Sequence, residues 1–443
     1  MVRRLSGSTN IIIPSRVTKH LTMISSLAVM GVYGAAAAQS IPSSVPPVAT
    51  SAPAAPSTAA APQTTSATPA PDYSGDLTGD WFGLRPKLQQ RGITFGGSLL
   101  ADGTWNLAGG EQTRNPAFRT QLTLDVSLST KKLLGVPGGT FYASYMGLWG
   151  HNGTTAPVGS LQLYDSIVNP RTSVLDELYY DQKFGGSAEL RVGLQDASDF
   201  FAQPPDAQPF LSDSPTEFPT LIDPPTFPDT APGVVAVFNP DGPLTIKFGA
   251  YYFDRFHPTA FDQMLNTLEP TGQPVGTVLM AEGDYNWLVD DKLPGIFAVG
   301  GNWLAGKLPT LGNSVQTGGG SVYCYADQSL WINSANQSVA GFITAMAADR
   351  RVSTIDFASQ GGIVTDGLVP MRPHDQIGLG YDWAHVSSLS GLPKPYELAI
   401  ETFYAFNFPH GITLQPDLQY YINTGAGVYP DAVVGSIRLS LSF

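Results

Sequence analysis

Acidic and aromatic side chains gather in one proline-rich stretch, residues 196–231. The stretch holds no lysine or arginine, but it holds seven carboxylates and five phenylalanines: Asp196, Asp199, Asp206, Asp213, Glu217, Asp223, Asp229, Phe200, Phe201, Phe210, Phe218 and Phe227. Carboxylates accept hydrogen bonds from hydroxyl groups, and aromatic faces pack against C–H groups, so this combination suits a carbohydrate. Prolines favour a fixed path for a long loop. We expect the stretch to fold inward and narrow a pore; the alternative is an outer loop that only shields a rim.

Charged and polar side chains also recur at alternate positions of shorter segments. In residues 119–130, Arg119 and Asp125 share a face opposite leucine and valine side chains. Such period-two alternation is typical of a strand that is polar on one side. The resulting pore-lining candidates are Arg119, Asp125, Glu177, Tyr179, Asp181, Lys183, Arg191, Glu282, Asp284, Glu397, Glu401, Asp417, Gln419 and Arg438. Together such charges would set the field of a channel, whereas each alone could be a solvated side chain with little effect on selectivity.

Residue types that build enzyme sites are present without the spacing that such sites need. The six histidines are scattered at no metal-ligand spacing: His20, His151, His257, His374, His385 and His410. No nucleophile elbow, phosphate loop or zinc-protease helix motif occurs. Cys324 is the only cysteine, so a disulfide within the chain is excluded. We expect no enzyme, no cofactor and no metal; a barrel enzyme that uses polar residues at its rim is the minor alternative.

Strands must position these side chains. The clearest strand pattern is in the last residues of the sequence, 433–443. It alternates without a break, with Val433, Ile437, Leu439, Leu441 and Phe443 on one face and Ser436, Arg438, Ser440 and Ser442 on the other. A terminal strand of this kind predicts a transmembrane β-barrel, with the apolar face toward lipid and the polar face toward water. The alternative is the last strand of a soluble sandwich.

Sixteen segments alternate in this way, an even number, as expected for an outer-membrane barrel. They are residues 93–107, 119–130, 139–149, 175–184, 187–195, 232–239, 243–253, 277–287, 295–305, 320–328, 338–347, 352–361, 375–386, 396–406, 411–422 and 432–443. The longest connections follow odd strands and tight turns often follow even strands, which predicts long outer loops and short periplasmic turns. The connections after the tenth and twelfth strands are longer than this rule expects. Pro416 lies inside the fifteenth segment, where we expect a local bulge.

The composition agrees with a wall of this kind. Charged residues make up 13 % of the 443 residues, and the formal net charge is −13. Low charge without long apolar runs suits strands that face lipid on one side and water on the other. The excess of acidic residues argues against a nucleic-acid partner.

Three segments precede the expected barrel at 93–443. Residues 1–38 combine basic residues, a short apolar core and three alanines before Gln39, which predicts a secretory signal peptide. Residues 39–72 are rich in Pro, Ala, Ser and Thr, which predicts a disordered spacer. Residues 73–92 predict an N-terminal segment with a short helix. No later stretch of about twenty apolar residues occurs, so we expect no other helix to span a bilayer.

Three motifs resemble one protein family. Residues 76–93 read D-L-T-G-D-W-F-G-L-R-P-K-L-Q-Q-R-G-I, residues 175–184 read L-D-E-L-Y-Y-D-Q-K-F, and residues 414–420 read L-Q-P-D-L-Q-Y. Together with the end of the chain at 438–443, these runs resemble the signature segments of the OprB-type carbohydrate-selective porins. The resemblance covers residues 73–443. It implies a sixteen-stranded barrel in the outer membrane of a Gram-negative bacterium, through which small sugars or polyols diffuse passively, with the short helix on the periplasmic side.

The resemblance also bears on partners. It implies that outer-membrane lipid surrounds the barrel, that the outer-membrane assembly machinery reads Phe443, and that the chain works as a monomer. One departure limits what can be carried over, because other members have charged residues facing the pore on the third strand, whereas residues 145–151 here read Y-M-G-L-W-G-H. Trp149 is a candidate stacking face instead. A general or differently selective channel and a secreted sugar-binding β protein are the alternatives.

Overall fold

The computed structural model describes residues 76–151, 157–167, 171–212, 218–222, 224–227, 230–254 and 275–443. The expected signal peptide at 1–38, the expected spacer at 39–72 and the first residues of the 73–92 segment lie outside the described residues.

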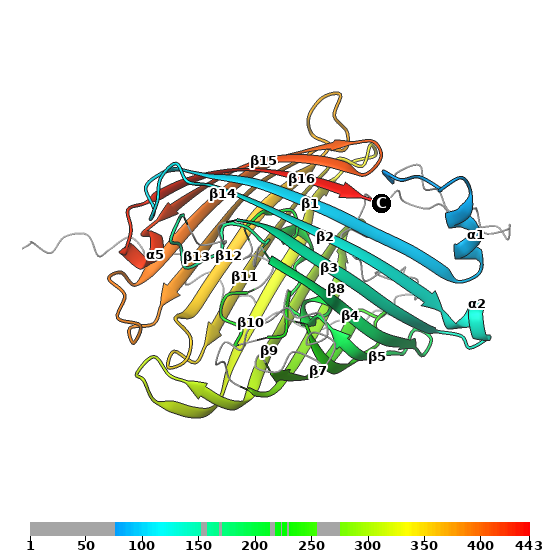
Figure 1. The fold of residues 1–443 in the computed structure, drawn as a ribbon, viewed down its shortest axis with the longest axis horizontal. Helices are drawn as coiled ribbons and strands as arrows, with labels where there is room; N and C mark the ends of the chain where they lie inside the picture. Colours follow the sequence, from blue (N-terminus) through cyan, green and yellow to red (C-terminus); the bar gives the residue numbers. More distant parts are fainter. Residues whose placement is uncertain are drawn as a thin grey trace, which may run out of the picture. The chain divides into compact units, whose positions relative to one another are not determined.

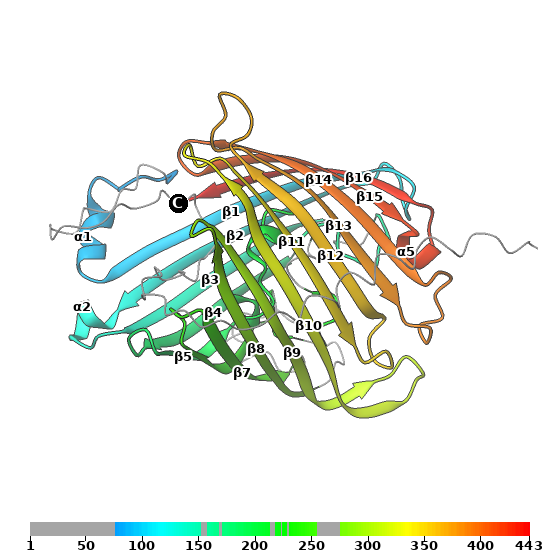
Figure 2. The same cartoon turned by 180° about the vertical axis from the view of Figure 1, so that it is seen from behind.

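Sixteen antiparallel strands close into one barrel (Figures 1 and 2). Their bounds are β1 Ile93–Ala108, β2 Pro116–Ser129, β3 Gly139–His151, β4 Arg171–Lys183, β5 Ala188–Gln195, β6 Ala231–Phe238, β7 Leu244–Asp254, β8 Val275–Val289, β9 Leu293–Pro309, β10 Val315–Ile332, β11 Ser338–Ala348, β12 Ile355–Asp366, β13 Gln376–Val386, β14 Tyr396–Phe408, β15 Ile412–Ile422 and β16 Ala432–Ser442. Each strand pairs with the strands before and after it in the chain. Every predicted segment overlaps one strand, so the predicted fold is confirmed.

The barrel closes where β16 pairs with β1. Their register runs from Ser98 opposite Ser442 to Ala108 opposite Val433. On β16, Ser436 is buried whereas its neighbour Ile437 is exposed. The last strand therefore turns its polar face inward and its apolar face outward, and no backbone edge is left open.

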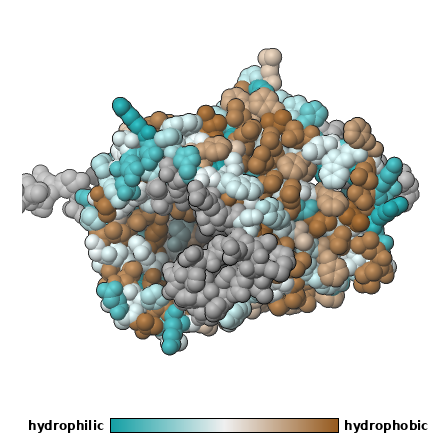
Figure 3. Space-filling model, viewed as in Figure 1, coloured by the Kyte–Doolittle hydropathy of each residue, from teal (hydrophilic) through white to brown (hydrophobic). Residues whose placement is uncertain are grey.

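The outer surface of the wall is apolar because every second side chain of each strand points outward. Five successive strands, β7 to β11, each carry a large apolar side chain that is about half exposed or more: Phe248, Leu279, Trp303, Val322 and Ile343. Figure 3 shows hydrophobic residues spread widely over the side of the barrel seen in that view. Such a large apolar surface is stable against lipid rather than water.

The connections differ strongly between the two ends of the barrel. Short turns follow β4, β6, β8 and β14, whereas residues 152–170 and 196–230 follow β3 and β5. The connection after β10 is also short, residues 333–337, because β10 continues to Ile332. A bulge between Ser329 and Trp331 disturbs the alternation there, which is why the sequence placed the end of this strand too early.

Pro416 produces no bulge, so that expectation is wrong. Its pairing with β16 is continuous, with Pro416 opposite Ile437. The pairing with β14 has the same register on both sides of the proline, from Phe403 opposite Asp417 to Phe406 opposite Leu414. Proline has no N–H group, so we attribute the gap between these pairs to a missing ladder bond rather than to an extra residue.

Short helices lie at the two ends of the barrel. Helix α1, Leu84–Gln90, precedes β1, and α2, Thr130–Leu134, follows β2. The turn α5, Thr424–Gly427, lies at the other end, between β15 and β16. Two 3-10 turns, η1 Ala197–Asp199 and η2 Pro205–Ala207, lie in the long connection after β5. No helix in the described part of the chain has the length and apolarity needed to cross a membrane.

Candidate functional site

The residues predicted to line the pore lie on the inner side of the wall, but most of them are covered. Ten of the fourteen are buried: Arg119, Glu177, Asp181, Arg191, Glu282, Asp284, Glu397, Glu401, Asp417 and Gln419. Asp125, Tyr179 and Arg438 are partly exposed, and Lys183 is exposed at the end of its strand beside Glu189. Several of these buried side chains, among them Glu282, Glu401 and Arg119, bind two segments of the chain that fold into the barrel.

The connection between β5 and β6 is the longer of these two segments, and it crosses the interior. Figures 1 and 2 show this green part of the chain within the ring of strands. Its backbone N–H groups donate to wall carboxylates in turn: Ala202 to Glu282 on β8 (2.8 Å), Asp206 to Asp327 on β10 (2.8 Å), and Leu211 to Glu401 on β14 (2.6 Å). Strands β5 and β14 lie on nearly opposite sides of the ring, so the segment spans the lumen.

Wall side chains also donate to backbone carbonyls of this segment. Lys247 Nζ donates to the carbonyl of Phe200 (2.7 Å), and the Asn302 amide donates to that of Ile222 (2.7 Å). Gln415 donates to the carbonyl of Pro209 (2.9 Å). The wall therefore satisfies both donors and acceptors of an irregular backbone, as a buried loop requires.

Four of the predicted loop phenylalanines anchor the segment to the wall. Phe200, Phe201, Phe210 and Phe218 are all at most 4 % exposed. Phe210 makes edge contacts with Phe342 and Phe403, with ring centroids 5.7 and 5.1 Å apart. Since their faces are buried, these four rings cannot stack on a solute, and that part of the expectation is wrong.

An aromatic and charged group beside the loop remains partly open. Tyr142 on β3 stacks on Tyr179 on β4, with centroids 4.9 Å apart and planes 21° apart. The Arg191 guanidinium lies 4.0 Å from the centre of the Tyr179 ring and 4.3 Å from that of Phe200. Arg191 also pairs with Asp199, whose side chain is 38 % exposed. Aromatic faces, a carboxylate and a guanidinium thus meet in one place.

A bulge in β4 and a turn after β5 shape this region. Leu175 lies opposite Tyr145 and Glu177 opposite Ser144, so Asp176 is the extra residue. The bulge moves the inward positions from even to odd numbers, which places Glu177 and the following odd residues on the inner face.

The turn after β5 is fixed by Asp196. Its carboxylate accepts hydrogen bonds from Ser198 N (2.7 Å), Ser198 Oγ (2.6 Å) and Phe227 N (2.8 Å), so it ties the start of the segment to its end. Burial, together with the charge of Asp199, raises the pKa of Asp196 to about 7.

A second inward segment, residues 157–167, was not predicted. Glu397 on β14 accepts from the N–H groups of Leu161 and Gln162 (2.9–3.0 Å). The Ser166 N–H donates to the carbonyl of Leu211 (3.0 Å), which joins the two inward segments to each other. Both inward segments thus lie inside the barrel and contact each other.

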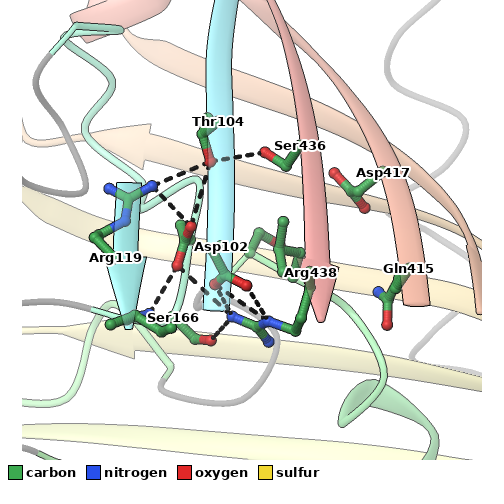
Figure 4. Close-up of polar contacts among 12 residues, drawn as sticks. Asp102, Thr104, Arg119, Ser166, Gln415, Asp417, Ser436 and Arg438 are labelled. Carbon is green, nitrogen blue, oxygen red and sulfur yellow. Dashed lines mark hydrogen bonds and ion pairs between the residues drawn. The ribbon is translucent and has the colours of Figure 1, made fainter. Parts of the chain in front are cut away.

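The second segment is held by a row of charges at the seam of the barrel (Figure 4). Asp102 on β1 lies opposite Arg438 on β16 and also opposite Arg119 on β2. Arg438 binds Asp102 through two nitrogens (2.7 and 2.9 Å), and Arg119 binds Asp165 of the inward segment (2.7 Å). Arg438 also lies 3.6 Å from Asp165. Two guanidinium and two carboxylate groups therefore balance within a site from which water is largely excluded.

Tyr164 and Ser166 complete this cluster. The Tyr164 hydroxyl accepts from Arg119 Nη1 (2.9 Å), and Ser166 Oγ accepts from Arg438 Nη2 (2.8 Å). Sequence patterns had indicated Arg119 and Arg438 but missed the partners Asp102 and Asp165. The closure of β16 on β1 was predictable, and it would have indicated Asp102 because aligned strands place opposite charges side by side.

Several other predicted residues lie elsewhere or outside the described residues. Asp213 and Glu217 lie outside the described residues, as do Asp223 and Asp229. Trp149 lies on the outer face, 45 % exposed, while its neighbour Leu148 is fully buried inside. The suggestion that Trp149 offers a stacking face to the pore is therefore wrong. Within the described residues, His, Cys, Asp and Glu form no group of three that could hold a metal ion.

Comparisons with known proteins agree with this architecture. The profile of the carbohydrate-selective porins of the OprB family matches residues 113–443. Porin B of Pseudomonas aeruginosa is 22 % identical over 417 residues, which cover 83 % of this chain and 91 % of Porin B. The high-pH structure of Pseudomonas putida OprB has a TM-score of 0.74 and 19 % identity, covering 84 % of this chain and 99 % of that chain. The low-pH structure has a TM-score of 0.57 and 18 % identity, covering 84 % and 100 %.

Proposed function

Because the chain belongs to the OprB family of carbohydrate-selective porins, we propose that its two inward segments form the constriction through which sugars pass. Membership of this family, together with the closed barrel, makes the protein an outer-membrane sugar porin and not an enzyme. Small sugars or polyols diffuse through it without energy coupling. What the proposal adds is the location of the step that selects among solutes.

The path of residues 196–230 is the observation that carries the proposal. Consecutive N–H contacts to β8, β10 and β14 stretch the segment across the lumen. Residues 157–167 also bind the wall, through Glu397 on β14 and Arg119 on β2. We infer that a solute passes through the opening that these two segments leave.

The partly open group around Tyr179 supplies the chemistry that a sugar needs at this opening. The partly exposed ring of Tyr142, which stacks on Tyr179, offers an apolar surface, and Asp199 offers an acceptor for hydroxyl groups. Arg191 is already paired with Asp199 and Asp181, so the site would hold a neutral solute through few and weak contacts. Weak binding is what conduction requires, because a tight site would not release its solute.

Deletion of residues 203–228 tests the constriction. We expect single-channel conductance to rise, and proteoliposomes to lose their preference for glucose over a larger oligosaccharide in swelling assays. Deletion of residues 389–392, four residues in the connection after β13, is a control outside the two inward segments and should change neither value. Unchanged conductance and swelling in the first variant, in protein that still shifts its gel mobility on boiling, would remove the segment from the constriction.

We also propose that α1, α2 and the short turns face the periplasm. The asymmetry of the connections supports this orientation, because outer-membrane barrels have short periplasmic turns. In a background in which Cys324 is changed to Ser, the variants Lys87→Cys and Ser390→Cys would be exposed to a maleimide too large for the pore. In intact cells only the Ser390→Cys variant should be labelled. Labelling of the Lys87→Cys variant alone would show that the barrel has the opposite orientation.

The proposed partner for assembly is the outer-membrane assembly machinery, which would read the terminal residue Phe443. Phe443 N–H donates to the carbonyl of Gly97 (2.9 Å), so the residue extends the pairing of β16 with β1. Removing Phe443 should lower the amount of heat-modifiable protein in the outer membrane and leave the conductance of each channel unchanged. A normal amount of assembled protein would argue against this partner. We further propose that one chain suffices for a channel, as the closed ring of strands supports.

A further inference from the structure

Two short helices form a continuous ledge at one end of the barrel. We define the ledge as residues 77–92 and 130–136, which contain α1 and α2. Figure 1 shows both helices at the same end, next to the start of β1 and the end of β2. Lys132 Nζ donates to the carbonyl of Gln89 (2.6 Å), and Ser129 N donates to that of Gly92 (2.8 Å), so the two parts hold each other.

Arg85 fixes the first part of the ledge to the barrel. Its guanidinium donates to Asp76 (2.7 Å), to the carbonyl of Gly79 (3.2 Å) and to the carbonyl of Phe95 on β1 (3.0 Å). It also lies 5.1 Å from the centre of the Trp81 ring. The ledge is thus a defined part of the fold rather than a loose end.

The ledge is basic although the chain as a whole has a net charge of −13. Lys87, Arg91, Lys131 and Lys132 are all exposed, and within the described residues none of them has an ion-pair partner. Asp80 is the only acidic residue of the ledge. Such a cluster favours an anionic partner.

The same ledge carries large apolar side chains in the open. Phe82 is fully exposed, Leu134 is 69 % exposed, and Leu84, Leu133 and Val136 are each about half exposed. Leu134 and Val136 lie within a few residues of Lys131 and Lys132, so apolar and cationic groups alternate over one small surface. A surface of this kind is typical of a bilayer interface, where acyl chains and headgroups meet.

The position of the ledge matches that interface. Two residues separate the end of α1 from the start of β1, and α2 begins directly after β2 ends. The outward side chains of these strands face lipid, so the ledge lies where the apolar wall stops. We propose that it binds the phosphate headgroups of anionic phospholipids, with phosphatidylglycerol as the type, while Phe82 and Leu134 insert among the acyl chains. The inference goes beyond transport and rests only on the proposed membrane embedding of the barrel.

Competition between two lipids in detergent tests the inference. Purified full-length protein is given equal amounts of phosphatidylglycerol and phosphatidylcholine, and the lipids that stay bound are counted by native mass spectrometry. We expect wild-type protein to retain phosphatidylglycerol in clear preference. The variant Lys87→Gln/Arg91→Gln/Lys131→Gln, which keeps the Lys132 contact with Gln89, should reduce that preference about tenfold or more, since each cation near an anionic surface contributes separately.

A matched control removes the same number of exposed charges from other parts of the barrel. Lys292→Gln/Lys307→Gln/Lys394→Gln should keep the wild-type preference. Inorganic phosphate at millimolar concentration should not displace the lipid, because it lacks the acyl chains that the apolar residues contact. The inference is overturned if wild-type protein shows no preference, if the ledge variant keeps it, or if the control loses it equally.

Channel measurements on the same samples separate this inference from the proposed constriction. The ledge variant should conduct and admit glucose as wild type does, because the ledge lies outside the lumen. If the protein prefers phosphatidylglycerol but forms no sugar-permeable channel, the proposed constriction is contradicted and the proposed lipid binding by the ledge is supported. A sugar-permeable channel with no lipid preference would defeat the ledge alone.

Discussion

The two segments that fold into the barrel both donate backbone N–H groups to wall carboxylates, but only residues 157–167 carry an ion pair to the wall whose two side chains are fully buried. In residues 196–230, neutral backbone N–H groups donate to carboxylates of the wall, such as Glu282 and Glu401. In residues 157–167, the segment itself contributes the carboxylate, Asp165, and the wall contributes Arg119 and Arg438. The first arrangement accepts almost any residue at the contact, because every residue except proline has an N–H group. The second requires specific side chains.

This difference predicts unequal responses to mutation. Weakening the hydrogen bonds between backbone N–H groups and a carboxylate costs a moderate amount of stability. Removing the carboxylate of a buried ion pair costs more, because it leaves the charge of the arginine buried without compensation. The ion-paired segment should therefore fail abruptly at one residue, and the hydrogen-bonded segment should weaken gradually over several.

Asp165→Asn should have the largest effect. It removes the ion pair between Asp165 and Arg119, both of which are fully buried, and breaking a buried pair in this way costs about 3–5 kcal/mol. We expect a lower temperature for the boiling-dependent shift in gel mobility and larger, noisier single-channel currents. The double variant Arg119→Met/Asp165→Leu should recover part of the loss. A single variant as stable as wild type would contradict the contrast between the two segments.

Phe210→Ala should have the next largest effect. The ring fills a site between Phe342 and Phe403, and removing a buried phenylalanine costs about 3 kcal/mol or more. Because the anchor belongs to residues 196–230, conductance should rise while the seam cluster stays intact. Phe227→Ala, at a partly buried ring, is the control with a smaller expected change. Equal changes in both variants would show that burial of Phe210 does not hold the segment.

Glu401→Gln should have a smaller effect, about 1–2 kcal/mol. Glutamine keeps one oxygen for the N–H groups of Leu211 and Ser212 but loses the charge that strengthens both bonds. Glu397→Gln, which affects the N–H contacts of Leu161 and Gln162, is the matched variant on the same strand. Thermal denaturation should give similar losses for both, well below that of Asp165→Asn; a loss as large as for Asp165→Asn would erase the distinction.

A change of pH should have the smallest effect, through Asp196. Its pKa of about 7 lies above the usual value near 4, so the protonated form is favoured in the folded protein. The stability that this contributes is complete below about pH 4, where the unfolded carboxyl is protonated as well, and it is lost progressively as the pH rises from there through 7. Between pH 6 and pH 7 the loss is at most about 1 kcal/mol. Asp196→Asn should remove this part of the pH dependence. The same slope in wild type and variant would exclude Asp196 as its source.

The wall was predictable from the sequence because its physics is local. Alternate residues of a strand must satisfy lipid and water in turn, so each segment carries its own signal, as at 433–443. β3 shows where this signal fails, since Met146 and Leu148 face inward yet are apolar, packing beside Ile167 of the inward segment. With both faces apolar, the sequence could not indicate to which side Trp149 points.

The interior was less predictable because its contacts join distant parts of the chain. The composition of residues 196–231 indicated an inward segment, but not that its phenylalanines would be buried as anchors. Residues 157–167 carry no comparable excess of charge or aromatic rings, and much of their contact with the wall is made by backbone groups. Backbone contacts leave no trace in residue type, so only the structure reveals them.

The row of Arg438, Asp102 and Arg119 has a consequence for how the barrel is made. Strands β1 and β16 come from opposite ends of the barrel sequence, and their pairing is the joint that turns an open sheet into a ring. A slip of two residues would keep every polar side chain inward but would place Arg438 opposite Leu100 or Thr104, with no carboxylate to bind. The ion pair thus stabilises the observed register of β16 on β1. The alternation of polar and apolar residues alone would not distinguish this register from one shifted by two residues.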